Sequence, residues 1–419
     1  MRVASRLAAS AGLVAIAASW AAATDFPGWR GPSRDGVARE KGLLRQWPQG
    51  GPRLLWQAKD VGYGFGSPAI VGNRAYVISS KGTEAEYLQA LDAGAGKLLW
   101  QAPIGKVGNP NQMPNYPGAR STPVVDGKLI YALGSDGDLV CLEAAAGKLR
   151  WRKSLRTDLG GKPGVWAYAE SPLIDGDKLI CAPGGAEATM AALDKRTGAV
   201  VWKCAVPGGD AAGYASTVIA TVGGKKQYVQ FLGGGAVGVD AATGAFLWRF
   251  ARPASQGNAS DPLVSGDRVY AGSGLAGGGQ ATLTAKGDGA FDVQQNYFDR
   301  ALPNGMGGFI LIGDCLYGAG NMGLFCVDWL TGQVRWRDRS VGPGSLLLAD
   351  GMLYLHGDKG DVALIKPSPE GYREKGRLTP PDQPERRRTQ AWSYPALSNG
   401  RLYIRDLERL WCYSVKGAR

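Results

Sequence analysis

The stretch ALDKRTGAVVW, residues 192–202, decides the fold because close copies of it recur along the chain. The copies read LDAGAGKLLW (91–100), LEAAAGKLRW (142–151), VDAATGAFLW (239–248) and VDWLTGQVRW (327–336). Most of them follow one another at intervals of about 50 residues, a period that indicates a repeat architecture such as a propeller or solenoid. The sequence therefore predicts one array of similar units rather than several unrelated domains.

A second segment precedes each copy and completes the unit. In STPVVDGKLIYAL, residues 121–133, two apolar runs flank a glycine turn, which is typical of a β-hairpin. The following DLVCLEAAAGKLRW, residues 138–151, adds two further strands around the Gly147 turn. Four antiparallel strands in each unit predict the blade of a β-propeller.

Eight such units can be counted, and the last one is incomplete. Residues 393–415 provide three strands, while GPRLLW, residues 51–56, matches the GKLLW end of the repeated phrase. We expect residues 52–56 to pair as the outer strand of the blade that contains Tyr403 and Trp411. The N-terminal strand would then close the ring and remove the free sheet edges.

The fold prediction is an all-β, eight-bladed β-propeller of four-stranded antiparallel blades over residues 52–417. Unit five ends in LTAKGDGAFDVQQNYF, residues 283–298, without the turn or the tryptophan. A regular blade is still expected there, with Tyr297 or Phe298 in the tryptophan position. In the units that carry the tryptophan, this side chain should fill the seam between blades as a structural anchor rather than a ligand platform. These blade tryptophans are Trp56, Trp100, Trp151, Trp202, Trp248 and Trp336.

The first 23 residues have the features of a secretory signal peptide. Arg2 and Arg6 precede a short apolar stretch, and Ala21 and Ala23 form a small-residue cleavage site. The first cysteine is Cys141, so a lipid anchor at that cleavage site is not expected. We predict cleavage near Ala23, a lead segment at residues 24–51, and a periplasmic or extracellular protein with no transmembrane segment.

Composition narrows the chemistry that the chain can perform. The formal net charge is +12, which favours anionic surfaces, although an exported protein is not expected to meet nucleic acid. Six cysteines lack any C-x-x-C spacing, and Cys141, Cys326 and Cys412 share one repeat position, which indicates a packing role. His356 is the single histidine and is expected at the surface or in a turn. Neither a metal site nor a catalytic residue is predicted.

The loops before each first strand provide the candidate site. In a propeller these loops converge on one mouth of the central channel, where aromatic and polar side chains form a typical binding site. The alternative is that these side chains pack together and plug the channel. Arg120 and Glu170, from neighbouring units, carry opposite charges that would favour the ionised form of both. The candidate mouth residues are Arg120, Trp166, Tyr168, Glu170, Tyr214, Asn258 and Trp392.

A long insert, residues 101–120, follows the first copy. It is polar and contains several prolines, so it is not expected to form a strand. We expect it to cover the mouth. If Arg120 lies beside an exposed Trp166 or Trp392, the mouth would suit a planar anionic ligand.

The pattern A-x-D-x-x-T-G-x-x-x-W resembles the tryptophan-docking repeat of the pyrroloquinoline quinone (PQQ) propeller superfamily. That superfamily includes quinoprotein dehydrogenases and the outer-membrane assembly factor BamB, and the resemblance implies eight blades. It covers about residues 52–417. The lead FPGWRGPSRDGVA, residues 26–38, is similar to the start of exported PQQ-binding-like β-propeller repeat proteins of planctomycete-type bacteria.

The repeat does not by itself imply the cofactor. The chain lacks the adjacent cysteine pair that quinoprotein dehydrogenases place over PQQ, and we find no recognisable motif for their Ca²⁺ ligands or catalytic aspartate. We therefore expect a non-catalytic, monomeric binding or scaffold protein of the bacterial envelope without a cofactor. Its partner would be an unknown envelope protein, peptide or glycan. The alternative is a PQQ- and Ca²⁺-dependent dehydrogenase that oxidises an alcohol or a sugar.

Overall fold

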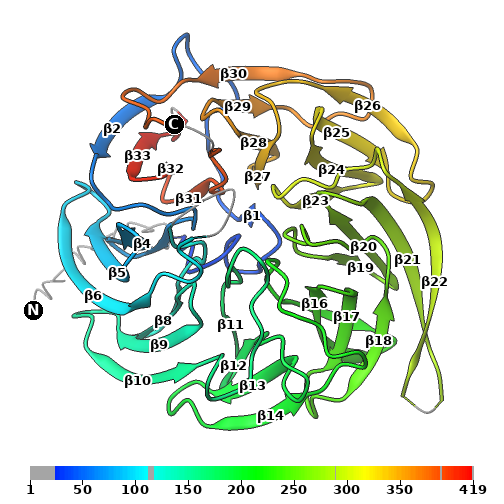
Figure 1. Cartoon of the computed structure of the whole chain (residues 1–419). Coiled ribbons are helices and arrows are strands. Elements are labelled where there is room, and N and C mark those ends of the chain that lie inside the picture. Colours follow the sequence, from blue (N-terminus) through cyan, green and yellow to red (C-terminus); the bar gives the residue numbers. More distant parts are fainter. Residues whose placement is uncertain (1–23, 112–117, 288, 387–388, 418–419) are drawn as a thin grey trace, which may run out of the picture.

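The computed structural model describes residues 24–111, 118–287, 289–386 and 389–417. In these ranges all regular elements are strands, and eight sheets form a closed ring (Figure 1). Each sheet contains four antiparallel strands in radial order, and one sheet has an additional short strand at its inner edge. The predicted eight-bladed propeller is therefore confirmed.

The first four blades follow the chain without interruption. Blade 1 contains β3 (Ala69–Val71), β4 (Arg74–Lys81), β5 (Ala85–Asp92) and β6 (Leu98–Lys106). Blade 2 contains β7 (Val124–Asp126), β8 (Leu129–Leu133), β9 (Asp138–Glu143) and β10 (Leu149–Ser154). Blade 3 contains β11 (Leu173–Asp175), β12 (Lys178–Cys181), β13 (Met190–Asp194) and β14 (Val200–Cys204). Blade 4 contains β15 (Val218–Val222), β16 (Lys225–Leu232), β17 (Gly235–Asp240) and β18 (Phe246–Phe250).

The last four blades include the two irregular ones. Blade 5 contains β19 (Leu263–Ser265), β20 (Arg268–Ser273), β21 (Gly277–Ala285) and β22 (Phe291–Asp299). Blade 6 contains β23 (Phe309–Ile312), β24 (Cys315–Gly320), β25 (Gly323–Asp328) and β26 (Val334–Asp338). Blade 7 contains β27 (Gly344–Ala349), β28 (Met352–Gly357), β29 (Val362–Ile365) and β30 (Glu374–Leu378), with β1 (Val37–Ala38) added inside β27. Blade 8 contains β31 (Ala396–Ser398), β32 (Arg401–Asp406), β33 (Arg409–Ser414) and the N-terminal β2 (Arg53–Ala58).

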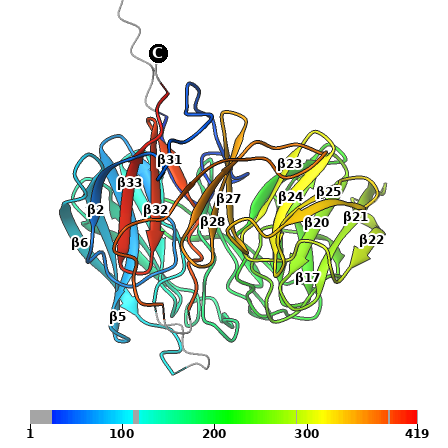
Figure 2. The same ribbon diagram turned by 90° about the horizontal axis from the view of Figure 1, so that it is seen from above.

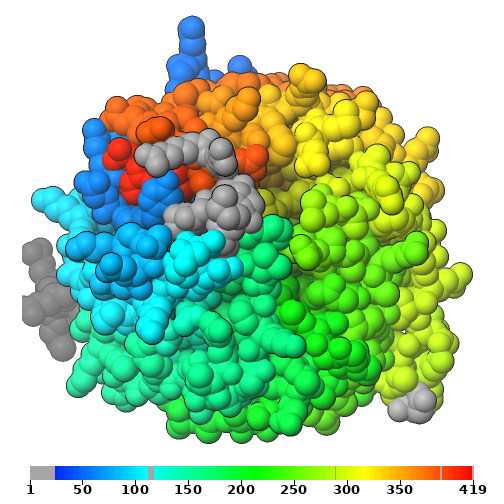
Figure 3. Space-filling view, in the orientation of Figure 1, coloured from blue at the N-terminus to red at the C-terminus, as the bar shows by residue number. Residues whose placement is uncertain are grey.

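The ring closes as predicted. Strand β2 pairs antiparallel with β33, and Trp56 lies opposite Cys412. The space-filling view shows the blades in chain order around the disc, with the C-terminal blade beside the first one (Figure 3). The buried Arg405 of blade 8 also joins this seam, because its Nη1 donates to the carbonyl oxygens of Gly66 and Ile78 at 2.9 and 2.8 Å.

The repeated motif joins successive blades, because the tryptophan of one blade packs against the turn glycine of the next. The ring of Trp100 lies against Gly147 in the turn of blade 2, so that a Cβ at Gly147 would be 2.6 Å from the indole. Gly147 also has a φ of 69°, which an L-residue rarely adopts. The turn glycine is therefore needed for its conformation and for the close approach of the preceding blade's tryptophan. The same contact joins Trp56 to Gly96, Trp151 to Gly198, and Trp202 to Gly244.

Blade 5 replaces the tryptophan with a tyrosine. The ring of Tyr297 lies against Gly332 of blade 6, where a Cβ would be 2.6 Å away, and its hydroxyl donates to the carbonyl of Trp329. Blade 5 is a regular four-stranded sheet despite its different sequence. Because blade 5 has no turn of this type, Trp248 of blade 4 instead donates to Gln227 of its own blade at 2.6 Å.

The first part of the lead segment, residues 24–38, lies in the central channel, and the sequence did not predict this placement. Phe26 pairs with Ile70 of blade 1 through two 2.8 Å backbone hydrogen bonds. Strand β1 then pairs parallel with β27, with Val37 opposite Leu348. Residues beyond β1 leave the channel and reach the outer strand β2. Figure 1 shows this dark blue segment at the centre of the ring, and Figure 2 shows part of it on the same face as the C-terminus.

Two further predictions about local structure were wrong. Residues 101–106 of the insert extend strand β6, because β5 is long enough to pair with them as far as Lys106; residues 112–117 lie outside the described residues. His356 lies on β28 and is fully buried, with Nδ1 2.9 Å from the Ser393 carbonyl. Every residue of β28 is buried, because both faces of this strand pack against neighbouring blades. His356 therefore has no face of the strand from which it could reach solvent.

The cysteines occupy the interior of the blades. All six are free and buried. Cys141 lies on β9 opposite both Tyr131 on β8 and Trp151 on β10. Cys326 and Cys412 occupy the same position in blades 6 and 8. A small apolar side chain therefore fits between two large rings within each of these blades.

Candidate functional site

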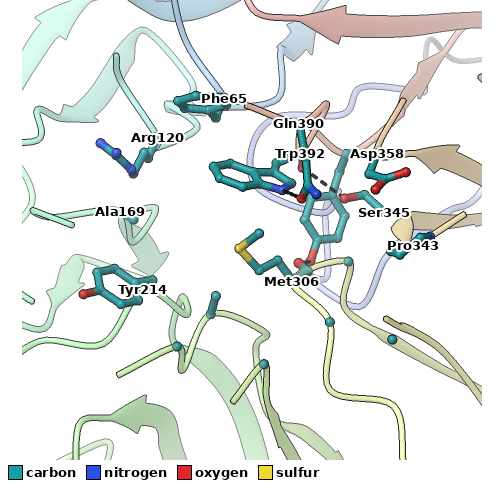
Figure 4. Close-up of a pocket in the computed structure, with 18 of the residues that line it drawn as sticks. Phe65, Arg120, Ala169, Tyr214, Met306, Pro343, Ser345, Asp358, Gln390 and Trp392 are labelled. Atoms are coloured by element: carbon teal, nitrogen blue, oxygen red, sulfur yellow. Dashed lines mark hydrogen bonds between the residues drawn. The ribbon is translucent and has the colours of Figure 1, made fainter. Parts of the chain in front are cut away.

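A pocket of about 380 Å³ opens at the mouth of the channel, on one face of the disc. It is formed by loops that precede the first strand of a blade and by loops that join the second and third strands (Figure 4). The lining residues are Trp29, Phe65, Arg120, Trp166, Ala169, Tyr214, Gly257, Ala259, Gly274, Leu275, Gly305, Met306, Gly307, Gly320, Asn321, Pro343, Gly344, Ser345, Asp358, Gln390, Trp392 and Tyr394.

The floor of the pocket comes from the lead segment. Trp29 Nε1 donates to Asp261 Oδ2 at 2.6 Å, and its ring lies edge-on to Tyr394 with centroids 4.6 Å apart. The Tyr394 hydroxyl donates to the Met306 carbonyl at 2.5 Å. Below these rings the lead crosses the channel, since Phe26 pairs with blade 1 and β1 pairs with blade 7. We therefore describe the site as a blind hollow with the lead as its floor.

Aromatic rings form one side of the pocket. Phe65 and Trp392 lie with centroids 5.1 Å apart, and Trp166 and Tyr214 with centroids 5.4 Å apart. The Tyr214 hydroxyl also accepts the backbone N–H of Trp166 at 3.1 Å, which ties the loops before blades 3 and 4 together. Such rings offer large apolar faces that lose little conformational entropy on binding.

The other side is lined by glycine backbone and a few apolar side chains. Glycines come from the loops of blades 5 to 7, and their missing side chains leave the hollow open. Leu275 is 72% exposed and Met306 is 38% exposed, and both lie at the rim. These two side chains add apolar surface to the edge of the pocket.

The charges in the lining are balanced. Among the described lining residues, Arg120 is the one cation and Asp358 the one carboxylate. Arg120 lies with its guanidinium carbon 5.7 Å from the Phe65 ring centroid, and burial lowers its pKa to about 10 although the nearby Glu86 opposes this. Burial also raises the pKa of Asp358. Figure 4 shows the two side chains on opposite sides of Trp392.

The structure brings four of the seven predicted mouth residues into the pocket lining, namely Arg120, Trp166, Tyr214 and Trp392. The other three lie behind it and are buried. The hydroxyl of Tyr168 donates to the Pro183 carbonyl at 2.9 Å, and Glu170 Oε1 accepts from the Ala182 N–H at 2.6 Å. Asn258 donates to the Leu232 carbonyl at 2.7 Å. These three side chains stabilise the loops rather than line the pocket.

The expected relation between Arg120 and Glu170 was wrong, because each of them has a different charged neighbour. Arg120 lies near Glu86 on β5, and burial raises the pKa of Glu86 to about 7. Glu170 lies near Arg34, which donates to the backbone carbonyls of Ser171 and Pro172 at 2.8 and 2.9 Å. Arg34 belongs to the lead, whose position inside the channel the repeat pattern did not show.

Sequence reasoning missed a second group of lining residues. Asp358, Asn321 and Leu275 come from loops between the second and third strands of blades 7, 6 and 5. In a four-stranded blade these loops return to the same face as the loops before the first strand. The strand count alone could therefore have indicated them.

The residues of the pocket do not fit a calcium–quinone centre. Ca²⁺ takes six to eight oxygen ligands, usually several of them carboxylates, whereas Asp358 is the one carboxylate among the described lining residues. Across the described ranges no group of three or more His, Cys, Asp or Glu side chains could hold a metal ion. The described part of the chain also contains no helix that is long and apolar enough to cross a membrane.

Solved structures share the fold at low sequence identity. BamB from Moraxella catarrhalis is 16% identical, with a TM-score of 0.55 over 82% of this chain and 95% of that one. Quinohemoprotein alcohol dehydrogenase from Comamonas testosteroni is 12% identical, with a TM-score of 0.61 over 94% of this chain and 81% of that one. At these identities the likeness concerns the fold alone.

Curated relatives match shorter segments. The outer membrane protein assembly factor BamB of Alkalilimnicola ehrlichii is 26% identical over 140 residues, which cover 33% of this chain and 32% of the relative. BamB of Salmonella typhimurium is 27% identical over 92 residues, or 22% of each chain. The chain thus matches about a third or less of the length of these relatives. The family described as outer membrane protein assembly factor BamB matches residues 84–338, and this chain belongs to that family.

Proposed function

We propose that the protein is a non-catalytic binding or scaffold propeller, exported to the bacterial envelope, that engages its ligand or partner at the mouth pocket. The observation that carries this proposal is the blind hollow of about 380 Å³, with aromatic rings on one side and exposed apolar side chains at its rim. Pockets of this size and lining are typical of binding sites. Membership of the BamB family supports a location in the envelope.

The arrangement of ionisable groups supports binding rather than catalysis. Acid–base chemistry needs titratable groups within hydrogen-bonding reach of the same atoms. Arg120 and Asp358 instead lie on opposite sides of the pocket (Figure 4). Burial raises the pKa of both Tyr214 and Tyr394, so their hydroxyls stay protonated near neutral pH.

The start of the chain supports export. Residues 1–23 have the charge and apolar pattern of a signal peptide, and the described chain is well packed from Phe26 onward. We infer that the mature protein begins near Thr24 and includes the lead and the propeller, residues 52–417. Its positive charge suits anionic components of the envelope.

A photo-crosslinking experiment tests the proposed function. A benzophenone amino acid would replace Leu275 at the rim of the pocket or, as the control, Leu98 on the outer strand β6, which is 55% exposed. In living cells we expect discrete adducts at position 275 that decrease when Trp392→Ala is added. Equal labelling at both positions, or none at position 275, would contradict the proposal.

A second measurement addresses the enzymatic alternative. The purified protein, supplied with PQQ and Ca²⁺, would be tested for dye-linked oxidation of alcohols and sugars. We expect no oxidation above that of PQQ alone. Oxidation that depends on PQQ and is lost in Arg120→Ala would favour a dehydrogenase instead.

A further inference from the structure

We propose that the mouth pocket binds the end of a neutral saccharide chain, with one sugar ring against Trp392 and its hydroxyl groups hydrogen-bonded to Asp358, Gln390 and Asn321. This inference rests on the proposed function, because it names the ligand class of the same pocket. Four features of the pocket support it: its closed floor, its indole platform, its polar side chains and its balanced charge.

The closed floor selects the end of a chain. Trp29 and Tyr394 lie at the floor of the pocket, the lead crosses the channel below them, and loops of all eight blades surround the hollow. An extended polymer that runs through a site needs two openings or a surface groove. A blind hollow of about 380 Å³ suits a terminal unit of a chain or a small free molecule.

The indole of Trp392 provides a platform at a defined position. Its Nε1 donates to Gln390 Oε1 at 2.8 Å, and its backbone carbonyl accepts the Ser345 hydroxyl at 3.0 Å. Phe65 packs against it with an interplanar angle of 44°. The face of an indole carries partial negative charge, and it therefore attracts the weakly positive C–H face of a sugar ring.

Polar side chains beside the platform offer both donors and acceptors. Within the described residues, Gln390 Nε2 and the Asn321 side-chain amide make no hydrogen bond to the protein, and both residues are exposed. The Asp358 carboxylate is a pure acceptor when ionised. Each sugar hydroxyl donates and accepts one or more hydrogen bonds, so this mixture matches a cluster of hydroxyls. Hydroxyl donors would also stabilise the partly desolvated Asp358 carboxylate.

The balance of charge favours a neutral ligand. Asp358 lies on one side of the Trp392 ring and Arg120 on the other (Figure 4). A multiply anionic ligand would meet Asp358, and a multiply cationic ligand would meet Arg120. Like charges that face each other across a binding site reduce affinity and are a common source of selectivity.

The test is calorimetric titration of the full mature chain with cellobiose, maltose and N,N′-diacetylchitobiose, and with the tripeptide Gly-Gly-Gly for comparison. We expect at least one disaccharide to bind and the tripeptide not to bind. Asn321→Ala and Gln390→Ala should each weaken binding by about fivefold, the effect of losing one hydrogen bond. Gln294→Ala, an exposed glutamine on β22, is the matched control and should leave the affinity unchanged.

The outcomes separate this inference from the proposed function. If no disaccharide binds, or if the pocket variants bind as well as the control, the saccharide inference is wrong. Crosslinking at position 275 would then still report whether the mouth is a recognition site. Binding of the tripeptide with loss in Asn321→Ala would overturn the saccharide inference and leave the pocket as a peptide site.

Discussion

The indole nitrogen of Trp29 donates a hydrogen bond to the Asp261 carboxylate over 2.6 Å, which joins the N-terminal lead to the loop before blade 5. The other oxygen of this carboxylate accepts the backbone N–H of Ser216 at 2.6 Å, and Arg30 Nη1 lies 3.6 Å from Oδ2. Asp261 is fully buried, as is nearly all of Arg30. One carboxylate therefore fixes the floor of the pocket, the lead and two neighbouring loops.

Removing this carboxylate should destabilise the whole protein. Asp261→Ala would leave Arg30 buried without its partner, and breaking a buried ion pair in this way costs roughly 3–5 kcal/mol. The measurement is the free energy of unfolding from urea denaturation. Asp292→Ala is the control, because Asp292 forms an exposed pair with Lys286 and should cost less than about 1 kcal/mol. Equal losses in the two variants would argue against the role of Asp261.

The contact between Trp100 and Gly147 can be tested with a matched pair of glycines. Gly147 and Gly127 both have positive φ angles, 69° and 59°, but a Cβ at Gly127 would meet nothing within 4 Å. Alanine at either position should therefore cost the left-handed backbone energy, about 1–2 kcal/mol. Gly147→Ala should cost a further 1–3 kcal/mol, roughly the price of overpacking, because Trp100 must move. If the two variants unfold at the same urea concentration, the tryptophan contact does not contribute.

Closure of the ring predicts a large effect at Trp56. This side chain is 9% exposed, lies against Gly96 of blade 1, and donates to the Ala93 carbonyl at 3.0 Å. Trp56→Ala should lower the free energy of unfolding by about 3–5 kcal/mol and expose the edge of blade 8. Trp392→Ala in the pocket should have a much smaller effect on unfolding. Light scattering on warming should then rise earlier for Trp56→Ala than for Trp392→Ala, and the reverse order would contradict the prediction.

The buried carboxylate of Glu86 predicts a dependence of stability on pH. Burial raises its pKa from 4.5 to about 7 although Ser135 donates two hydrogen bonds to it, at 2.6 and 2.7 Å. The folded protein thus binds the proton more tightly than the unfolded chain does. The free energy of unfolding should fall as the pH rises from about 4.5 to 7, by up to about 3 kcal/mol from this group, and then level off.

Comparison of the wild type with Glu86→Gln isolates this contribution. The amide is neutral at all these pH values and keeps an oxygen that can accept the Ser135 N–H. Glu170 contributes in the same direction in both proteins, because burial raises its pKa to about 7 as well. The difference in stability between wild type and variant should therefore change between pH 4.5 and 7. Parallel curves over that range would contradict the prediction.

The blades could be predicted because the residues that form each blade lie within one repeat and follow a recurring pattern. The turn glycine and the tryptophan of one unit, such as Gly147 and Trp151, recur at the same positions in the sequence of the next unit. The end of the same motif at residues 51–56 indicated the strand that closes the ring. In blade 5 the sequence left Tyr297 and Phe298 as alternatives for the tryptophan position, and the structure places Tyr297 there. Contacts of the lead could not be predicted, since Phe26 and Arg34 meet partners that lie far away in sequence and share no repeated pattern.

The site could be predicted in part for a related reason. Register identified the loops, but not which side chains would face the hollow. Trp166 lines the pocket while Tyr168, two residues later, is buried behind it. Residues two apart share a side only in an extended strand. Ala167 between them has a φ of 68°, which turns the backbone, and nothing in the sequence marks an alanine for that conformation.

The lead also breaks the rotational near-symmetry of the ring. The contacts between tryptophan and glycine are nearly the same at several seams, so they do not distinguish one blade from another. The lead does distinguish them, because Phe26 pairs with blade 1, Arg34 bonds to the entry of blade 3, Trp29 to that of blade 5, and β1 to blade 7. A duplicated or deleted blade would change the angles between the blades, so these partners would no longer match their positions along the lead. The contacts of the lead are therefore satisfied together only in a ring of eight blades. The lead thus favours eight blades over the seven or nine that the repeats alone could form.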